Sequence, residues 1–357
     1  MSYKLFLSSF AAFMALNCFA NNELSEVASY KEILDKSYNL INLDMVRQNS
    51  PGIDGSNVNV GIMDTSININ HPSLRGKNLG VSGVSFETSW NNSGGKNTHG
   101  THVAGIILGK KINNYEPYGV AHNSNFYNFG IIGERNNGFH DVNQAFKNKN
   151  IKVINHSWGK SIYPLINTQF DNGYRNLLNN MRSQYPNYWG HKNKIDYELV
   201  RWLAGKNTQD LIALSKDDKI LNVFAAGNSG IISSSIDSVV PSYDEDIRAW
   251  LNVGNLNALN AEKNADGSIT LKNDFQISWN DAESKDFYGR PTQWIGIDGS
   301  LLSSQLFVGS TNYSLLAPGY QILAANANLS ATYKEKYIPM TGTSMAAPMV
   351  SGAAALV

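Results

Sequence analysis

Short apolar runs alternate along this chain with stretches in which apolar residues recur at helical spacing. The runs that predict β-strands lie at residues 58–64, 126–131, 151–159, 220–226 and 250–254. Helices are expected at 142–149 and 209–216, and a helix of small residues is expected to begin near His99. Alternation of short strands with helices is typical of βαβ units. We therefore expect an α/β fold with a mainly parallel central sheet.

Three other regions have patterns of their own. Residues 21–55 are polar and mixed, with an amphipathic helix expected around 32–43, and they predict an N-terminal wrapping segment. Residues 160–207 are rich in aromatic side chains and predict an insertion. Residues 255–305 are hydrophilic with several turn signals, which suggest inserted hairpins over the core. One large domain is therefore expected over residues 56–357.

The first 20 residues have the pattern of a secretory signal peptide. Lys4 precedes the apolar residues 5–16, and small residues at Cys18 and Ala20 predict cleavage after Ala20. A membrane anchor is the alternative, but the apolar run is shorter than the roughly 20 residues that a spanning helix needs. A lipoprotein signal at Cys18 is a second alternative, which Asn17 fits poorly. Cys18 is the only cysteine, so the mature chain would contain no disulfide.

Composition limits the classes of partner. The chain has 29 Lys and Arg residues and 29 Asp and Glu residues, so its formal net charge is zero. A balanced charge implies no acidic partner, and nucleic acid is not an expected ligand. The hydrophobic content of 42% in 357 residues is enough to bury a substantial core. Disorder is therefore not expected.

Four residues with reactive or polar side chains follow strands or begin helices. Asp64 ends the first predicted strand, and charged residues at such ends line crevices in open α/β sheets. His99 starts the small-residue helix, and Asn228 lies in a glycine-flanked turn after a strand. Ser344 precedes a long apolar run, so free N–H groups and the positive end of a helix dipole would surround it. An ordinary helix-capping serine is the alternative at this point.

These four positions lie in four motifs, in the chain order Asp, His, Asn, Ser. The motifs are Ile-Met-Asp-Thr at 62–65, His-Gly-Thr-His-Val-Ala-Gly at 99–105, Ala-Ala-Gly-Asn at 225–228 and Gly-Thr-Ser-Met-Ala-Ala-Pro at 342–348. Weaker matches are His-Pro-Ser-Leu at 71–74 and Ala-Pro-Gly at 317–319. With these motifs the sequence closely resembles the subtilisin-like serine peptidases, from about residue 56 to the C-terminus. The resemblance implies a three-layer sandwich, in which helices flank the sheet, with inserted loops and hairpins.

The resemblance also implies a division of chemical roles. Ser344 would be the nucleophile, and His99 would be the base that takes its proton. Asp64 would hold the imidazole ring in the right tautomer and stabilise the imidazolium. Asn228 would donate its side-chain amide to the oxyanion, together with the backbone N–H of Ser344.

A fifth segment is expected to bind substrate. Peptidases of this class bind the substrate backbone as an added antiparallel strand. The corresponding family segment usually reads Asn-x-Ser-Leu-Gly, and here residues 155–159 read Asn-His-Ser-Trp-Gly. By resemblance, Ser157, Trp158 and Gly159 would line the P1 to P4 subsites, and the alternative is a plain core strand. Trp in place of Leu favours the peptidase passenger domains of bacterial autotransporters as the subfamily.

The remaining histidines have weaker claims. His102 lies three residues after His99, so an H-x-x-H metal pair is conceivable, but no third ligand is near in sequence. We therefore expect His102 to be structural, with no catalytic metal and no required cofactor, although structural calcium remains possible. Surface or packing positions are expected for His71, His122, His140, His156 and His191. Asp54 precedes a glycine and is expected to serve a turn.

Some features depart from the family pattern. Ser66 stands where a glycine is usual, which would alter a turn but leave the three catalytic residues intact. The segment before the first strand is too short for a folding propeptide. The chain stops at Val357 within an apolar helix, without a capping residue. We therefore expect a longer natural chain with a C-terminal secretion domain.

The sequence thus predicts an exported serine endopeptidase that acts on protein or peptide substrates. It would be secreted or carried on the cell surface or outer membrane of a bacterium. The alternative is a catalytically silent binding or adhesin module on the same fold, because a fold does not guarantee activity. A metallohydrolase that uses His99 and His102 is a third reading.

Overall fold

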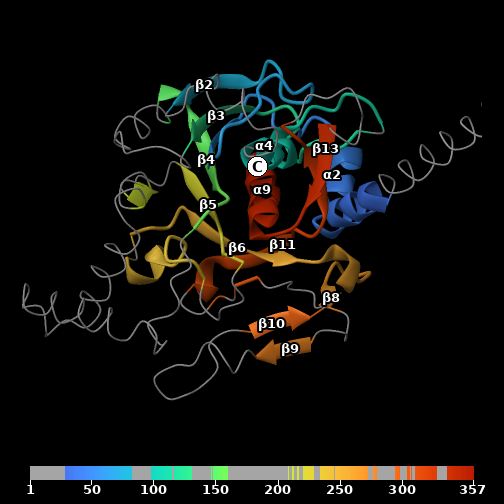
Figure 1. Ribbon diagram of the computed structural model, residues 1–357, viewed down its shortest axis with the longest axis vertical. Helices are drawn as coiled ribbons and strands as arrows, with labels where there is room; N and C mark the ends of the chain where they lie inside the picture. Colours follow the sequence, from blue (N-terminus) through green and yellow to red (C-terminus); the bar gives the residue numbers. More distant parts are fainter. Residues whose placement is uncertain are drawn as a thin grey trace, which may run out of the picture.

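The structure is a computed structural model of the chain (Figure 1). It describes residues 29–82, 98–114, 116–130, 146, 148–159, 208, 211–212, 215–216, 220–228, 234–244, 246–271, 276–279, 294–297, 304–305, 307, 310–327 and 336–357. The expected signal peptide, the aromatic-rich insertion, His140 and His191 lie outside these residues.

A seven-stranded parallel sheet forms the centre of the described molecule, with the strand order β11-β6-β5-β4-β1-β3-β2 (Figure 1). The strands are β1 (Asn59–Asp64), β2 (Asn78–Ser82), β3 (Asn125–Gly130), β4 (Ile151–His156), β5 (Leu221–Ala225), β6 (Trp250–Leu256) and β11 (Ser314–Pro318). The five predicted strands are all present, so the mainly parallel α/β fold is confirmed.

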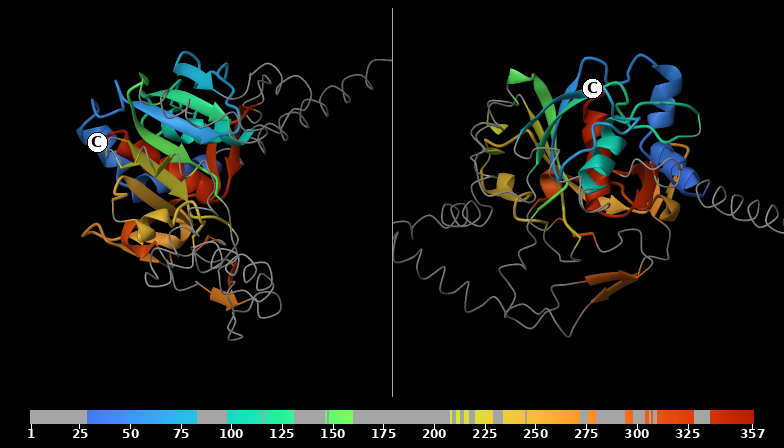
Figure 2. Two further views of the ribbon diagram at one scale, coloured as in Figure 1. Left: turned by 90° about the vertical axis from the view of Figure 1, so that its left-hand side faces the viewer. Right: turned by 45° about the horizontal axis from the view of Figure 1, so that its top comes forward.

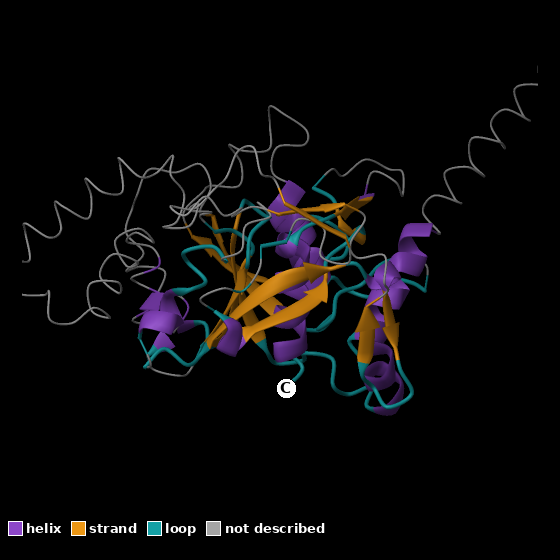
Figure 3. Ribbon diagram, turned by 90° about the horizontal axis from the view of Figure 1, so that it is seen from below, coloured by secondary structure: helices purple, strands orange, loops and turns teal. Residues whose placement is uncertain are grey.

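Both faces of the sheet are buried. On β1, Val60 and Ile62 belong to one buried cluster and Met63 to another, because successive side chains point to opposite faces. On β5, Val223 and Phe224 divide in the same way. A parallel sheet covered on both faces gives near-continuous apolar strands, which is the pattern in the sequence. Helical segments accordingly lie on both sides of the strands (Figure 3).

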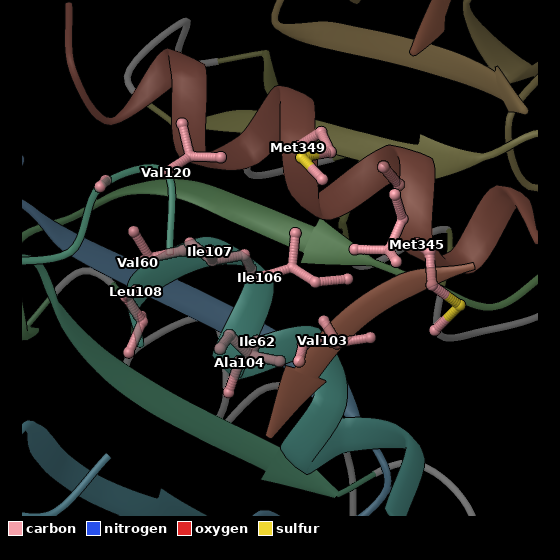
Figure 4. Packing of buried hydrophobic residues seen from close by; sticks show 14 of the residues in the cluster. Val60, Ile62, Val103, Ala104, Ile106, Ile107, Leu108, Val120, Met345 and Met349 are labelled. Atoms are coloured by element: carbon pink, nitrogen blue, oxygen red, sulfur yellow. The ribbon is translucent and has the colours of Figure 1, made fainter. Parts of the chain in front are cut away.

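Two long helices pack together on one face. They are α4 (Thr98–Leu108) and α9 (Thr343–Ala354), which lie side by side (Figure 2). Ile106 and Ile107 of α4 and Met345 and Met349 of α9 fill the space between the helices and the sheet (Figure 4). This packing sets the starts of α4 and α9 near the carboxyl ends of the central strands.

The N-terminal segment folds onto the same body. Residues 29–40 are helical, and α2 (Leu43–Asn49) follows after a turn in which Asn42 has a left-handed backbone. The expected helix at 32–43 is therefore present but begins and ends earlier. The Arg47 guanidinium lies 4.6 Å from the ring centroid of Tyr38 and 3.9 Å from that of Tyr118, which anchors the segment.

Smaller elements complete the description. Antiparallel pairs join β7 (Ala261–Lys263) to β8 (Ile269–Leu271), β9 (Gln276–Trp279) to β10 (Trp294–Ile297), and β12 (Ile322–Ala325) to β13 (Tyr337–Met340). Short 3₁₀ helices are η3 (Val240–Tyr243), η4 (Ala258–Asn260) and η5 (Thr311–Tyr313). The first two strand pairs confirm hairpins within residues 255–305. Among the described helices, none is long and apolar enough to cross a membrane.

Candidate active site

Asp64 and His99 lie in direct contact. Asp64 is the last residue of β1 and His99 is the second residue of α4, and His99 Nδ1 lies 2.7 Å from Asp64 Oδ1. Asp64 is 1% exposed, whereas the His99 side chain is 34% exposed. Because a carboxylate only accepts hydrogen bonds, Nδ1 carries the proton that it donates to Asp64. The other ring nitrogen, Nε2, is then free to accept a proton.

Burial and the neighbouring Asp64 together set the pKa of the His99 imidazole. Burial lowers the pKa of His99, but the charge of Asp64 and the hydrogen bond to it raise the pKa, and the net pKa is raised above its ordinary value of 6.5. A raised pKa makes His99 a better proton acceptor.

Thr65 joins the end of β1 to the start of α4. Its N–H donates to Asp64 Oδ1 over 2.7 Å, and its Oγ1 accepts from the N–H of Gly100 over 2.8 Å. A Cβ on Gly100 would lie 2.2 Å from the carbonyl oxygen of Thr65, so only glycine allows this approach. Sequence reasoning assigned no role to Thr65, although its position directly after Asp64 could have indicated one.

Ser344 is the second residue of α9, after Gly342, whose φ of 152° lies in a region that favours glycine. The Ser344 hydroxyl donates to the carbonyl oxygen of Ser157 over 3.0 Å. Its single proton is therefore directed at the Ser157 carbonyl. The structure thus joins Asp64 to His99 directly, and it joins Ser344 to the expected substrate-binding segment.

Asn228, in the turn after β5, has a fixed amide orientation. Its Oδ1 accepts from the N–H of Thr343 over 2.9 Å and from the Thr343 hydroxyl over 3.0 Å. Thr343 Oγ1 in turn accepts from the N–H of Gly227 over 3.1 Å. Because Oδ1 accepts from Thr343, the Nδ2 donor is the other atom of this exposed amide, and it lies next to Gly342, where an added Cβ would be 3.2 Å from it. Sequence reasoning also assigned no role to Thr343, although it lies next to Ser344.

Ser157, Trp158 and Gly159 directly follow β4, and Ser157 contacts Ser344. Ser157 is buried and Trp158 is half-buried. The Trp158 ring packs edge-on against His156 and Phe224, with centroid distances of 5.6 Å to each. His156 stacks face to face on Phe224 at 4.0 Å. The Trp158 indole therefore packs against two buried aromatic rings, His156 and Phe224.

The described histidines away from His99 are packing residues. His102 is fully buried, its Nε2 lies 2.9 Å from the Ile338 carbonyl oxygen, and burial lowers the pKa of His102 to about 4. His71 contacts Ser73 Oγ and the Lys336 carbonyl, and His156 contacts Asn222. Among the described residues, no group of three His, Cys, Asp or Glu side chains could hold a metal ion. Asp54 binds the N–H and hydroxyl of Ser56, as expected for a turn.

Comparison with known proteins adds independent information. A subtilisin of Bacillus pumilus is 36% identical over 115 residues, which cover 31% of this chain and 40% of that protein. An extracellular serine protease of Serratia marcescens is 33% identical over 109 residues, which cover 29% of this chain and 10% of that protein. These alignments thus span less than half of each relative.

Solved structures are similar over more of the chain. The prenylagaramide maturation protease PagA is 18% identical with a TM-score of 0.49, over 87% of this chain and 78% of that one. A cold-adapted subtilisin-like serine proteinase is 22% identical with a TM-score of 0.42, over 85% and 76%. A sequence model of the subtilase family matches residues 55–357. Because this match covers more than half of the chain and includes Asp64, His99, Asn228 and Ser344, the chain belongs to the subtilase family.

Proposed function

We propose that the protein is a serine endopeptidase in which Asp64, His99 and Ser344 form the catalytic triad. The observation that carries the proposal is the 2.7 Å contact between His99 Nδ1 and a carboxylate that is 1% exposed. A buried carboxylate on one ring nitrogen leaves the other nitrogen as a base. Ser344, at the start of α9, supplies a hydroxyl whose weak nucleophilicity requires such a base.

The reaction begins with the Ser344 hydroxyl. Rotation about the Cα–Cβ bond of Ser344 turns its hydroxyl from the Ser157 carbonyl toward His99 Nε2. Nε2 then takes the hydroxyl proton as Ser344 Oγ bonds to the substrate carbonyl carbon. The imidazolium, stabilised by Asp64, then gives that proton to the leaving amine as the C–N bond breaks. Water attacks the resulting ester in the same way, with His99 as base and then acid, and releases the acid product and Ser344.

Asn228 and Ser344 would form the oxyanion hole. The Nδ2 group of Asn228 and the backbone N–H of Ser344 are the proposed donors. The contacts of Thr343 with Asn228 Oδ1 support this assignment, because they hold the amide in one orientation before substrate binds. The N–H of Ser344 lies in the first turn of α9, where backbone N–H groups have no helical acceptor.

Ser157, Trp158 and Gly159 would bind the substrate backbone as an added strand. Their position directly after β4 and beside Ser344 supports this assignment. The Ser157 carbonyl, which now accepts from Ser344, would be available to a substrate N–H once the Ser344 hydroxyl turns away. The Trp158 indole would contribute to the P1 to P4 subsites.

We also place the protein outside the cytoplasm, as a bacterial secreted or cell-surface enzyme. The pattern of residues 1–20 supports export. The Serratia marcescens relative is an extracellular protease by its name, which agrees with this location. The proposed substrates are proteins or peptides.

Peptide hydrolysis by the full chain tests the function. The wild-type protein should cleave a denatured protein substrate at internal bonds, and Ser344→Ala should lose about 10⁶-fold in turnover, the size of this loss in subtilisin. Ser37→Ala is the control for loss of one serine hydroxyl, because the buried Ser37 donates only to the Ile33 carbonyl of its own helix. Folded wild-type protein that cleaves nothing would favour the silent binding module instead.

A further inference from the structure

A series of directed hydrogen bonds runs from the C-terminal half of α9 back to its start. The Ser351 hydroxyl donates to Asn155 Oδ1 over 2.8 Å, and Asn155 Nδ2 donates to Ser157 Oγ over 2.9 Å. The Ser157 hydroxyl donates to the Ser344 carbonyl over 2.8 Å. Asn155 and Ser351 are 0% exposed and Ser157 is 4% exposed, so water does not compete for these contacts.

The direction of each bond is fixed by the groups involved. A carbonyl oxygen only accepts, so the single Ser157 proton must go to Ser344. Ser157 Oγ can then only accept from Asn155, which identifies the nitrogen of that amide as the atom facing Ser157. Asn155 Oδ1 consequently faces Ser351 and accepts its proton. The reversed amide would place an oxygen against Ser157 with no proton between them.

The final acceptor in the series is a carbonyl that the helix cannot satisfy. In an α-helix the carbonyl of residue 344 accepts from the N–H of residue 348. Residue 348 is proline and has no N–H, although it lies inside α9. The Ser157 hydroxyl supplies the missing donor. It therefore fixes the peptide plane of the residue that carries the proposed nucleophile.

Ser157 also contacts Ser344 a second time. The Ser344 hydroxyl donates to the Ser157 carbonyl over 3.0 Å, while the Ser157 hydroxyl donates to the Ser344 carbonyl. A shift of Ser157 would therefore move both the main chain and the resting hydroxyl of Ser344. Asn155 and Ser351 are the groups that hold Ser157 in place.

The geometry points to Asn155 and Ser351 as positioning residues for the nucleophile, acting through Ser157. This inference rests on the proposed peptidase function. Misplacement of a reacting group by about 1 Å can cost on the order of 100-fold in rate. Ser351 acts only through Asn155 and Ser157, so loss of its hydroxyl should have a smaller effect. It should lower the acylation rate by about tenfold with little change in KM.

The test measures the second-order rate of labelling by a small fluorophosphonate, together with kcat and KM for a peptide ester, in Ser351→Ala, Ser157→Ala and the double variant. If Ser351 acts through Ser157, the double variant should be no slower than Ser157→Ala alone. Ser37→Ala, the matched buried control, should label at the wild-type rate. A thermal unfolding midpoint for each variant separates folding effects from rate effects.

Other results overturn the inference. Wild-type rates in folded Ser351→Ala, or effects of Ser351→Ala and Ser157→Ala that simply multiply, would show that Ser351 only supports the fold. If Ser351→Ala does not fold, Asn155→Asp applies the same test, because it keeps the acceptor for Ser351 and removes the donor to Ser157. A wild-type protein that is folded but never labelled refutes the peptidase function itself, which is a different outcome from labelling that ignores Ser351.

Discussion

The carboxylate of Asp64 accepts two hydrogen bonds at the same oxygen, one from His99 Nδ1 and one from the N–H of Thr65, each over 2.7 Å. The second bond comes from the adjacent main chain and fixes the carboxylate at the end of β1. His99 is thus oriented by a group that is itself held rigidly.

Asp64→Asn should lower kcat by about 10⁴-fold, because an amide nitrogen facing Nδ1 favours the wrong imidazole tautomer. Steady-state hydrolysis of a peptide ester measures the effect. Asp54→Asn is the control, since Asp54 binds only turn and loop groups at Ser56 and Asn123. Equal activity of Asp64→Asn and wild type would rule out the role given to Asp64.

The pH profile should follow the titration of His99. The imidazolium cannot accept the Ser344 proton, so kcat/KM should rise with pH through a pKa above 6.5. The same raised pKa stabilises the folded state at low pH, and this contribution is lost as pH rises through the folded pKa. In Asp64→Asn, which lacks the carboxylate charge, the apparent pKa of His99 measured from the residual kcat/KM should fall. An unchanged apparent pKa would contradict the assignment of His99 as the base.

Buried His102 and His156 should make the fold sensitive to acid. Burial lowers the pKa of His102 to about 4 and that of His156 to about 3, so the unfolded chain binds these protons first as pH falls. Stability should therefore decrease from about pH 6.5 toward pH 4, opposite in sign to the effect of His99. His156→Phe, which keeps a ring against Phe224, should flatten the dependence of the unfolding midpoint on pH in this range.

His156→Phe should also lower stability at every pH, but this loss does not affect the slope that the test measures. Asn222 Oδ1 would lose its contact with His156 Nε2, so the midpoint should be lower at pH 8. Only the slope of midpoint against pH reports the titration. An equally steep slope in His156→Phe would show that other groups cause the acid sensitivity.

Asn228→Ala should lower kcat by about 10²–10³-fold with a small change in KM, since the oxyanion donor acts mainly in the transition state. Asn228→Asp retains an oxygen for Thr343 but replaces the donor with an acceptor, and its loss should be at least as large. Single-turnover acylation measures both variants. A change confined to KM would place Asn228 in substrate binding only.

Chelation should separate catalysis from stability. EDTA is expected to leave fluorophosphonate labelling of Ser344 intact in protein that stays folded, because no metal takes part in the proposed chemistry. Calcium added back is the control for any stabilising ion. Activity that is lost to EDTA and restored by zinc alone would support the metallohydrolase that uses His99 and His102.

The sequence predicted the parts of this molecule that depend on local pattern. Asp64 at a strand end and Ser344 at a helix start were both recognisable from apolar runs and motif order. The edge strand β11 was not predicted, because Pro318 ends it and short edge strands tolerate proline that central strands reject. The N-terminal helix ended early because Asn42 adopts a left-handed backbone, which side-chain periodicity does not reveal.

Contacts between segments that are distant in the chain could not be predicted from the sequence. Pro348 shows that the Ser344 carbonyl lacks a helical donor, but nothing in the sequence identifies Ser157 as the replacement. These partners are 187 residues apart and meet only because β4 and α9 pack together. The resting direction of the Ser344 hydroxyl has the same origin. Motifs therefore indicate the proposed reactive groups, and the fold determines how each one is held.

The most direct test of the central claim is the site of covalent modification. The full chain is treated with a small fluorophosphonate, digested, and mapped by mass spectrometry. The proposed triad predicts a single phosphonyl adduct on Ser344, formed faster as pH rises through the pKa of His99 and absent after His99→Ala. An adduct on a different serine, or folded protein that carries no adduct, would contradict it.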